Sequence, residues 1–227
     1  MTNNSRIVFL SYTVVIWYNY NIEKGYYVEK AIKYFMDEDY QMAINLFVNI
    51  KEKKDKNYLK ALFYLGCCYC NLKQYKEVKL VYLKLLNSAK SYEDQALYLH
   101  QLSMVDRLKK DYKSALTYNH KEAVLRKKHH LETPLEMATL YYETSFINLL
   151  LNQYDQAIKF ADQALLYAEE SHDKMTLGCV YRVLGDIYKA LDCKSDCRKY
   201  YESSLRSFII TGDNVALEEI KSRISEI

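Results

Sequence analysis

The chain has 227 residues, 50% of them hydrophobic, so it is long enough to bury a sizeable core as one domain or one repeat array. Five glycines, one proline and the absence of Asn-Gly and Asp-Gly pairs argue against a β-rich fold. A formal net charge of +3 is too near neutral for a nucleic-acid footprint, and the six cysteines lack a disulfide framework. We therefore expect a cytoplasmic protein with reduced, buried thiols and no direct nucleic-acid binding.

The first candidate element is the uncharged segment from Ile7 to Ile22, which contains Trp17, Tyr18 and Tyr20. It is shorter than the ~20 apolar residues of a transmembrane helix. It also lacks the small-residue cleavage pattern of a signal peptide. We expect a packed N-terminal helix within residues 1–23 and no membrane association, with a membrane or export signal as the alternative.

Residues 24–212 carry a recurring pair of signals. A small residue in one helix is followed nine positions later by an aromatic residue that opens the next helix. The markers are Ala31 with Tyr40, Gly66 with Tyr75, Ser103 with Tyr112, and Ser145 with Tyr154, and the same frame holds at Gly185, followed by Cys197 and Tyr201. A small side chain lets two helices approach closely, and because one pair cannot bury its apolar faces alone, several pairs must stack. The pattern predicts five stacked helix pairs.

The spacing of the small residues lengthens along the chain, from 35 and 37 residues to 42 and 40. The later pairs therefore have room for about one extra turn in each helix. One position breaks the frame: Asp106 and Asn148 stand where the other pairs have Tyr34, Tyr69 and Tyr188. Either the third and fourth pairs pack differently there, or the register shifts by a few residues.

The last element is an apolar stripe of Leu217, Ile220, Ile224 and Ile227, spaced for one face of a helix. It predicts a capping helix over residues 213–227, which covers the last pair.

From Gly25 to Phe208 these residues match the tetratricopeptide consensus, and the chain resembles that superfamily. The resemblance implies an all-α, right-handed superhelical solenoid of about five helix pairs, with an N-terminal helix and a C-terminal capping helix. It also implies a single array, residues 1–227, that binds a short peptide or protein segment on its concave face.

A narrower resemblance rests on the run from Gly178 to Lys189 and on Glu218 to Ile224, which are similar to the end of PlcR-type regulators. The PlcR, NprR and Rap group sense secreted peptides, commonly as homodimers. Only residues 1–24 precede the first pair here, and they lack a helix-turn-helix pattern. The chain is thus a sensor module without its output domain, a part of a longer regulator, or an unrelated repeat protein.

In that group an asparagine two residues before the small residue grips the peptide backbone. This sequence has other residues there, namely Glu29, Tyr64, Gln101, Glu143 and Val183. The resemblance makes Tyr64, Gln101 and Glu143 candidate peptide contacts.

In the repeat frame, solenoid curvature directs one stripe of each first helix into the groove. The remaining candidate groove residues are Asn71, His100, Arg107, Tyr142, Phe146, Arg182, Asp186 and Lys189. The stripe is apolar and aromatic in the early pairs and cationic at Arg182 and Lys189, which suits an apolar peptide with an acidic group or a free carboxylate. In the alternative interpretation, the apolar residues are buried between repeats and the charges are solvated.

The cluster of Cys67, Cys68 and Cys70 has no neighbouring His or Cys to complete a tetrahedral zinc site. Nucleophile motifs, a phosphate loop and a paired-carboxylate site are absent from the sequence. We expect no catalytic residue, metal or cofactor.

The leading hypothesis is a non-catalytic, peptide-sensing regulator module of the quorum-sensing type. The alternative is a scaffold that docks a folded partner, or a second copy of itself, through the N-terminal helix or the convex face. A membrane-anchored adaptor is the third hypothesis.

Overall fold

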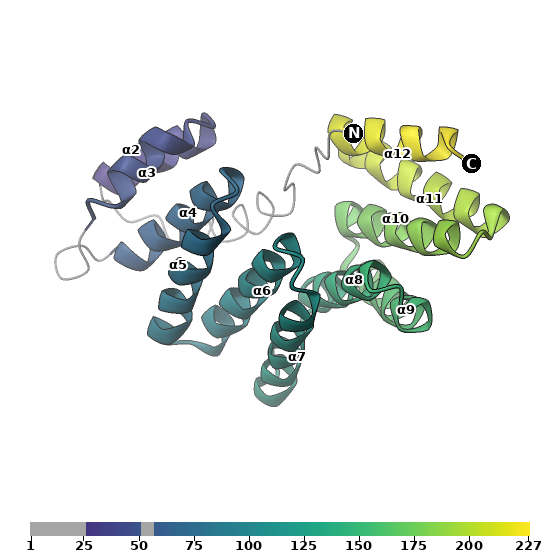
Figure 1. Ribbon diagram of the computed structural model, residues 1–227, viewed down its shortest axis with the longest axis horizontal. Helices are drawn as coiled ribbons and strands as arrows, with labels where there is room; N and C mark the ends of the chain where they lie inside the picture. The colour runs from purple at the N-terminus through teal and green to yellow at the C-terminus, as the bar shows by residue number, and fades with distance from the viewer. Residues whose placement is uncertain (1–25, 51–56) are drawn as a thin grey trace. The chain divides into compact units, whose positions relative to one another are not determined.

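The computed structural model describes residues 26–50 and 57–227, so the predicted N-terminal helix within residues 1–23 lies outside the described residues. The described residues form helices and no strand (Figure 1). The helices are α2 (Tyr26–Met36), α3 (Tyr40–Phe47), α4 (Tyr58–Asn71), α5 (Tyr75–Ser88), α6 (Tyr92–Leu108), α7 (Tyr112–His129), α8 (Pro134–Leu150), α9 (Tyr154–Ser171), α10 (Lys174–Ala190), α11 (Lys194–Thr211) and α12 (Asn214–Ser225). The prediction of an all-helical fold is confirmed.

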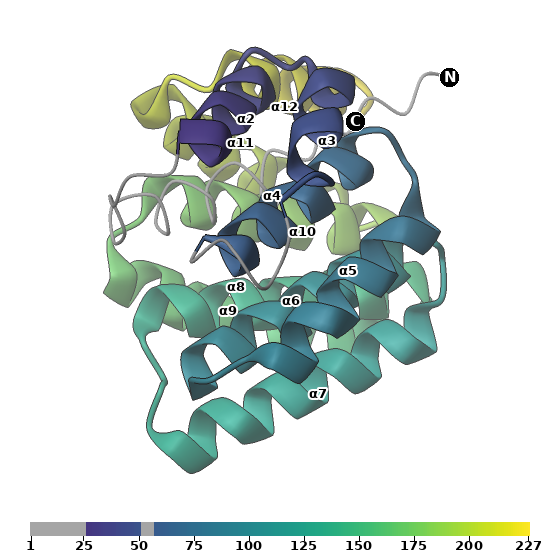
Figure 2. The ribbon, with the colours of Figure 1, turned by 90° about the vertical axis from the view of Figure 1, so that its left-hand side faces the viewer.

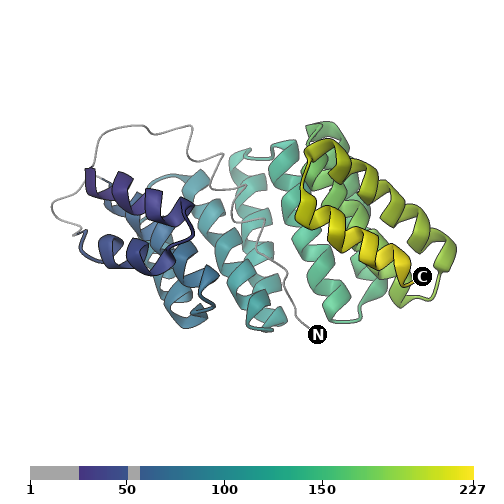
Figure 3. The same ribbon diagram turned by 90° about the horizontal axis from the view of Figure 1, so that it is seen from above.

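The helices belong to two compact units, which divide at Lys90 and Ser91. Unit 1 contains the pairs α2/α3 and α4/α5, and the two purple helices of its first pair lie side by side in Figure 2. Unit 2 contains the pairs α6/α7, α8/α9 and α10/α11, followed by α12, which lies along α11 in Figure 3. We call the first helix of each pair, together with α12, an A helix, and the second a B helix.

One type of turn closes all five pairs, and it settles the register. A residue with positive φ follows the first helix of each pair, namely Glu38, Lys73, Lys110, Asn152 and Asp192. The next amide then donates to a carbonyl five residues back, at 2.8–2.9 Å, in the manner of a Schellman motif; the acceptors are Tyr34, Tyr69, Asp106, Asn148 and Tyr188. The register therefore holds in every pair. The packing differs instead, because Asp106 and Asn148 are buried whereas the three tyrosines are partly exposed.

The small residues of the frame lie where each A helix approaches its B helix. A Cβ atom on Gly185 would lie 2.2 Å from the ring of Tyr201, and one on Gly66 would lie 2.9 Å from that of Tyr82. Where the frame has serine, the hydroxyl donates to a carbonyl of the B helix: Ser103 to Ala115 at 3.0 Å and Ser145 to Ala157 at 2.7 Å. Glycine thus makes room for a ring, while serine ties the two backbones together.

The paired helices of unit 2 are longer than those of unit 1, as the spacing predicts. Helices α6 to α11 have 17 or 18 residues, whereas α4 and α5 have 14 each. Side-chain caps fix several starts in unit 2, including Ser91 of α6, Thr133 of α8 and Asp213 of α12. The predicted C-terminal helix is present as α12. Ile220, from its predicted apolar stripe, is fully buried. None of the described helices combines the length and apolarity that a membrane crossing requires.

Candidate functional site

Two of the predicted groove residues, Tyr64 and Asn71, lie on α4 in unit 1. Tyr64 is fully buried, and its ring contacts those of Phe35, Phe47 and Phe63 at centroid distances of 5.3–6.1 Å. Asn71 is partly exposed and donates from Nδ2 to the carbonyl of Cys67 at 3.0 Å. Tyr64 therefore acts in core packing, and Asn71 is the candidate of this unit that reaches the surface.

The other predicted residues lie in unit 2, where α6 and α8 bring four of them together. Arg107 of α6 donates from Nε to the Glu143 carboxylate at 2.8 Å and from Nη2 at 3.4 Å. Its guanidinium also lies 5.2 Å from the centroid of the Phe146 ring, which is stacked with Tyr142 at 6.3 Å. A bidentate ion pair and an aromatic face thus hold one guanidinium in a fixed orientation.

The same arrangement continues on α10 and α12. Arg182 donates to the Tyr142 hydroxyl at 3.4 Å and to Glu219 at 2.9 Å. Glu219 also accepts from Arg223 at 2.8 Å, and Arg223 in turn pairs with Asp186. We call this set the cation–aromatic ladder; it consists of Arg107, Tyr142, Glu143, Phe146, Arg182, Asp186, Glu219 and Arg223. It joins all four A helices of unit 2.

Burial and pairing shape the electrostatics of the ladder. The side chains of Arg107 and Arg182 are only 16% and 18% exposed. Burial opposes ionisation of Glu219, but Arg182 and Arg223 outweigh it and lower the pKa of that carboxyl. For Asp186 burial dominates and raises the pKa, despite the neighbouring Arg223 and the hydrogen bond from Tyr201. Because these cations already have carboxylate partners, an acidic ligand would have to share or displace those partners.

Lys189 is placed apart from the ladder, near the C-terminal end of α10. Its Nζ atom lies 2.6 Å from Glu226, and both side chains are exposed. An exposed pair of this kind contributes little to stability.

His100 and Gln101 lie within the packing of unit 2, where both are buried. His100 Nδ1 lies 3.1 Å from Glu122 of α7, whose other oxygen accepts from Arg126 Nε at 2.8 Å. Burial opposes the charged form of His100, but attraction to Glu122 and the hydrogen bond to it outweigh burial, so its pKa is raised. This buried ion network joins α6 to α7 and leaves little of His100 for a ligand.

In the peptide regulators, the residue two positions before the small residue contacts the peptide backbone. In this chain most of the side chains at those positions are buried. Glu29 is exposed, whereas Tyr64, Gln101, Glu143 and Val183 are at most 1% exposed. At these four positions the side chain serves the packing between helices.

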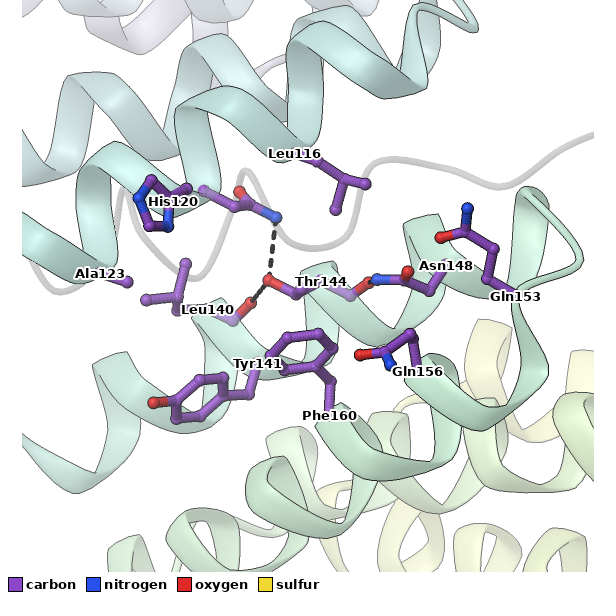
Figure 4. Close-up of a pocket in the computed structure, with 11 residues that line it drawn as sticks. Leu116, His120, Ala123, Leu140, Tyr141, Thr144, Asn148, Gln153, Gln156 and Phe160 are labelled. Carbon is purple, nitrogen blue, oxygen red and sulfur yellow. Dashed lines mark hydrogen bonds between the residues drawn. The ribbon is translucent and has the colours of Figure 1, made fainter.

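Unit 2 also contains a pocket of about 360 Å³ between α7, α8 and α9 (Figure 4). Its polar lining is formed by Asn119, His120, Thr144, Asn148, Gln153 and Gln156. No motif in the sequence predicts this pocket. Its one signal in the sequence is Asn148, which stands where three of the other pairs have tyrosine.

The cysteines of the Cys67–Cys70 cluster are buried in α4. Burial raises the pKa of the Cys67 thiol to about 12, so this thiol stays protonated and weakly reactive at neutral pH. Among the residues that the structure describes, no group of three or more His, Cys, Asp or Glu side chains is arranged to hold a metal.

Comparison with solved structures supports the tetratricopeptide fold. The chain superimposes with a TM-score of 0.73 and 17% identity on a signal transduction ATPase with numerous domains from Pyrococcus horikoshii, which carries a tetratricopeptide repeat sensor. That match covers 88% of this chain and 31% of the other, so the chain spans about a third of that protein. A thermophilic tetratricopeptide protein from Thermus thermophilus matches with a TM-score of 0.62 and 14% identity, over 87% of this chain and 97% of that one.

The apo form of RapI matches over 95% of this chain and 88% of its own length, with a TM-score of 0.62 and 12% identity. At these identities the likeness establishes the fold alone. No protein-family model and no curated protein matches the chain.

Proposed function

We propose that this tetratricopeptide-fold chain is a non-catalytic binding module, and that it holds a peptide or protein segment against the cation–aromatic ladder of unit 2. The observation that carries the proposal is the ladder itself. It presents two partly exposed guanidinium groups, those of Arg107 and Arg182, beside the rings of Phe146 and Tyr142.

The chemistry of the ladder suits a peptide. A guanidinium offers several donors in one plane, so it binds backbone carbonyls as well as carboxylates. Glu143 and Glu219 hold these groups in place before a ligand arrives, which lowers the ordering cost of binding. The half-buried Phe146 ring adds apolar area next to the donors.

A signal sensor of the quorum-sensing type, with a regulatory output, is the finer form of the proposal. In that form the ligand rearranges the pairs that connect the A helices, and Arg182–Glu219 is central because it ties α12 to α10. A change in those contacts would alter the surface that a partner or a second copy of the chain meets.

The experiment is to isolate the protein from its native host, denature it, and identify released peptides by mass spectrometry. Any recovered peptide is synthesised and titrated against the wild type, Arg182→Gln and Phe146→Leu, with Lys159→Ala on the exposed surface of α9 as the matched control. Arg182→Gln leaves Glu219 its partner Arg223, so the fold is retained.

We expect Arg182→Gln to weaken binding about tenfold, with a larger loss at low salt than at high salt, because charge pairs are screened by salt. The control should bind as the wild type does. Equal affinity of Arg182→Gln, Phe146→Leu and the wild type at both salt concentrations would remove the ladder as the binding surface.

A further inference from the structure

The helix pairs share one frame, so each pair is an internal reference for the others. In the last pair, Tyr188 of α10 stacks on Tyr200 of α11 with 5.3 Å between ring centroids. In the preceding pair, Asn148 takes the place of Tyr188, and Phe160 takes the place of Tyr200. The turn hydrogen bonds to the carbonyls of Asn148 and Tyr188, both 2.9 Å, establish that the two positions are equivalent. The pocket of unit 2 is therefore lined by a residue, Asn148, whose equivalent in the last pair is a tyrosine.

The hydrogen bonds at the pocket wall leave one buried acceptor unused. Thr144 Oγ1 donates its only proton to the carbonyl of Leu140 at 2.8 Å, so Asn119 must donate to Thr144 from Nδ2, at 3.1 Å (Figure 4). The other atom of that amide, Asn119 Oδ1, has no hydrogen-bond partner among the described residues, although the side chain is only 2% exposed. A buried acceptor without a partner is costly, but this atom has almost no accessible surface, so a ligand must pair with the other amides of the lining.

The rest of the lining carries few ionisable groups. None of the described residues that line the pocket is Asp, Glu, Lys or Arg, and its one basic side chain is the imidazole of His120. Amide side chains of Asn148, Gln153 and Gln156 lie on one side of the pocket in Figure 4, while Tyr141 and Phe160 supply aromatic surface. A cation would lose its hydration without gaining a counter-charge, and an anion would meet only the imidazole of His120, so the lining favours an uncharged group.

We propose that this pocket binds one uncharged residue of an extended peptide segment. The side chain of that residue packs on Tyr141 and Phe160, and its backbone N–H and carbonyl pair with the side-chain amides of Gln153 and Gln156. The volume of about 360 Å³ is at the lower end of the range for ligand pockets, which fits a single residue rather than a whole peptide.

The proposal rests on the proposed peptide-binding function and gives the module a second point of contact. Thr144 and Asn148 lie roughly half a turn around α8 from Tyr142 and Phe146, because each residue advances the helix by ~100°. The pocket and the ladder are therefore on different faces of α8, and a variant of one leaves the other in place.

The test begins with a selection of phage-displayed random heptapeptides on the full chain. Enriched sequences are synthesised and titrated calorimetrically against the wild type and two pocket-filling variants. Asn148→Tyr supplies the ring that the last pair already accommodates, and Ala123→Phe fills the pocket from a half-exposed position on α7. Tyr188→Asn makes the opposite exchange away from the pocket and serves as the matched control.

We expect enriched peptides with an uncharged residue at one fixed position, and about thirtyfold weaker binding to both pocket-filling variants, as for the loss of a buried anchor. Tyr188→Asn should retain the wild-type affinity. A peptide that binds the wild type, Asn148→Tyr and Ala123→Phe equally would overturn the proposal, as would a selection that enriches nothing on the wild type relative to Asn148→Tyr.

The ladder variant Arg182→Gln separates this proposal from the proposed function. If Arg182→Gln weakens binding and the pocket-filling variants do not, the module binds peptides without the pocket, and the pocket proposal fails alone. If the pocket-filling variants weaken binding and Arg182→Gln does not, the pocket is supported and the ladder is not the site.

A second measurement uses N-acetyl-leucinamide, a small probe with a peptide N–H, a carbonyl and an apolar side chain. It should shift the side-chain amide signals of Gln153 and Gln156 in ¹⁵N NMR spectra of the wild type, and N-acetyl-leucine, which carries a carboxylate, should shift them less. Unchanged signals with both probes would count against the pocket.

Discussion

The two units use the same frame but hold their helices together differently. In unit 1 the interior between α2, α3 and α4 is aromatic, with Tyr64 surrounded by Phe35, Phe47 and Phe63. In the part of the chain that the structure describes, every buried polar or charged residue lies in unit 2. Apolar contacts stabilise without selecting one geometry, whereas a buried ion pair is stable only in one arrangement. We therefore expect the stability of unit 2 to depend more strongly on individual polar pairs than that of unit 1.

The largest effect on this comparison should come from Glu122, which is the centre of the buried ion network in unit 2. Glu122→Ala leaves Arg126 and His100 without their shared carboxylate, and losing one partner of a buried pair costs about 3–5 kcal/mol. Chemical denaturation followed by circular dichroism measures the loss. Glu77→Ala on the exposed surface of α5 is the control in unit 1, and equal stability of the two variants would show that the network is not stabilising.

The second effect compares the two frame glycines. Gly185→Ala places a Cβ 2.2 Å from the Tyr201 ring, whereas Gly66→Ala places one 2.9 Å from the end of the Tyr82 ring. Overpacking costs about 1–3 kcal/mol, and the higher helix propensity of alanine offsets about 1 kcal/mol of it. We expect a clear drop in unfolding free energy for Gly185→Ala and a smaller one for Gly66→Ala. The reverse order would mean that unit 1 is packed more tightly than unit 2.

The third effect is the pH dependence of unit 2. The groups that act on His100 are Glu122, Glu143 and Arg126; the two carboxylates outweigh both burial and Arg126, so the pKa of His100 is raised. Its stabilising contribution is therefore complete below the ordinary histidine pKa and is lost as the pH rises through the raised value. The pKa of Glu122 is lowered, because His100 and Arg126 outweigh its burial, so it stays ionised over that range.

The direction of this pH dependence is tested by the thermal midpoints of the wild type and His100→Gln, measured from mildly acidic to alkaline pH. The wild type should be the more stable at acidic pH, and the two curves should converge as the pH rises. A difference that grows with pH would contradict the assignment.

The smallest effect is a difference in thiol reactivity, which reports local opening in each unit. Cys193 is exposed, whereas Cys67, Cys68 and Cys70 in unit 1 and Cys179 and Cys197 in unit 2 are buried. A thiol reagent should label Cys193 rapidly and the others only as their helices open. In Cys193→Ser, mass spectrometry of labelled fragments then ranks the two units, and we expect the cysteines of unit 2 to be protected longer.

Much of the fold could be predicted from local pattern. The helix pairs, the longer helices of unit 2 and the C-terminal helix follow from small residues, aromatic residues and apolar stripes at fixed spacing. The register at Asp106 and Asn148 could not be predicted from the sequence. The turn hydrogen bond accepts at a backbone carbonyl, so it does not depend on the type of side chain at that position.

The candidate site was predicted in part. Arg107, Tyr142, Phe146 and Arg182 were predicted to lie on the groove-facing stripe of the first helices. The structure brings these four residues into one ladder. The carboxylate partner of Arg182, Glu219 on α12, was missed, since it lies 37 residues away and no local spacing connects the two residues. Whether any of the predicted residues belongs to a binding groove stays a prediction, and Tyr64 is buried in the core of unit 1.

The helices, their pairing and the C-terminal helix follow from the amino-acid sequence, because these depend on contacts within a few turns of chain. Which charges are paired, and where a pocket remains, depends on the packing between helix pairs. Arg107 meets Glu143 across 36 residues, and Asn119 meets Thr144 across 25. Such pairs depend on how one helix pair stacks on the next, and a one-dimensional pattern records the faces of helices but not the orientation of the side chains between them.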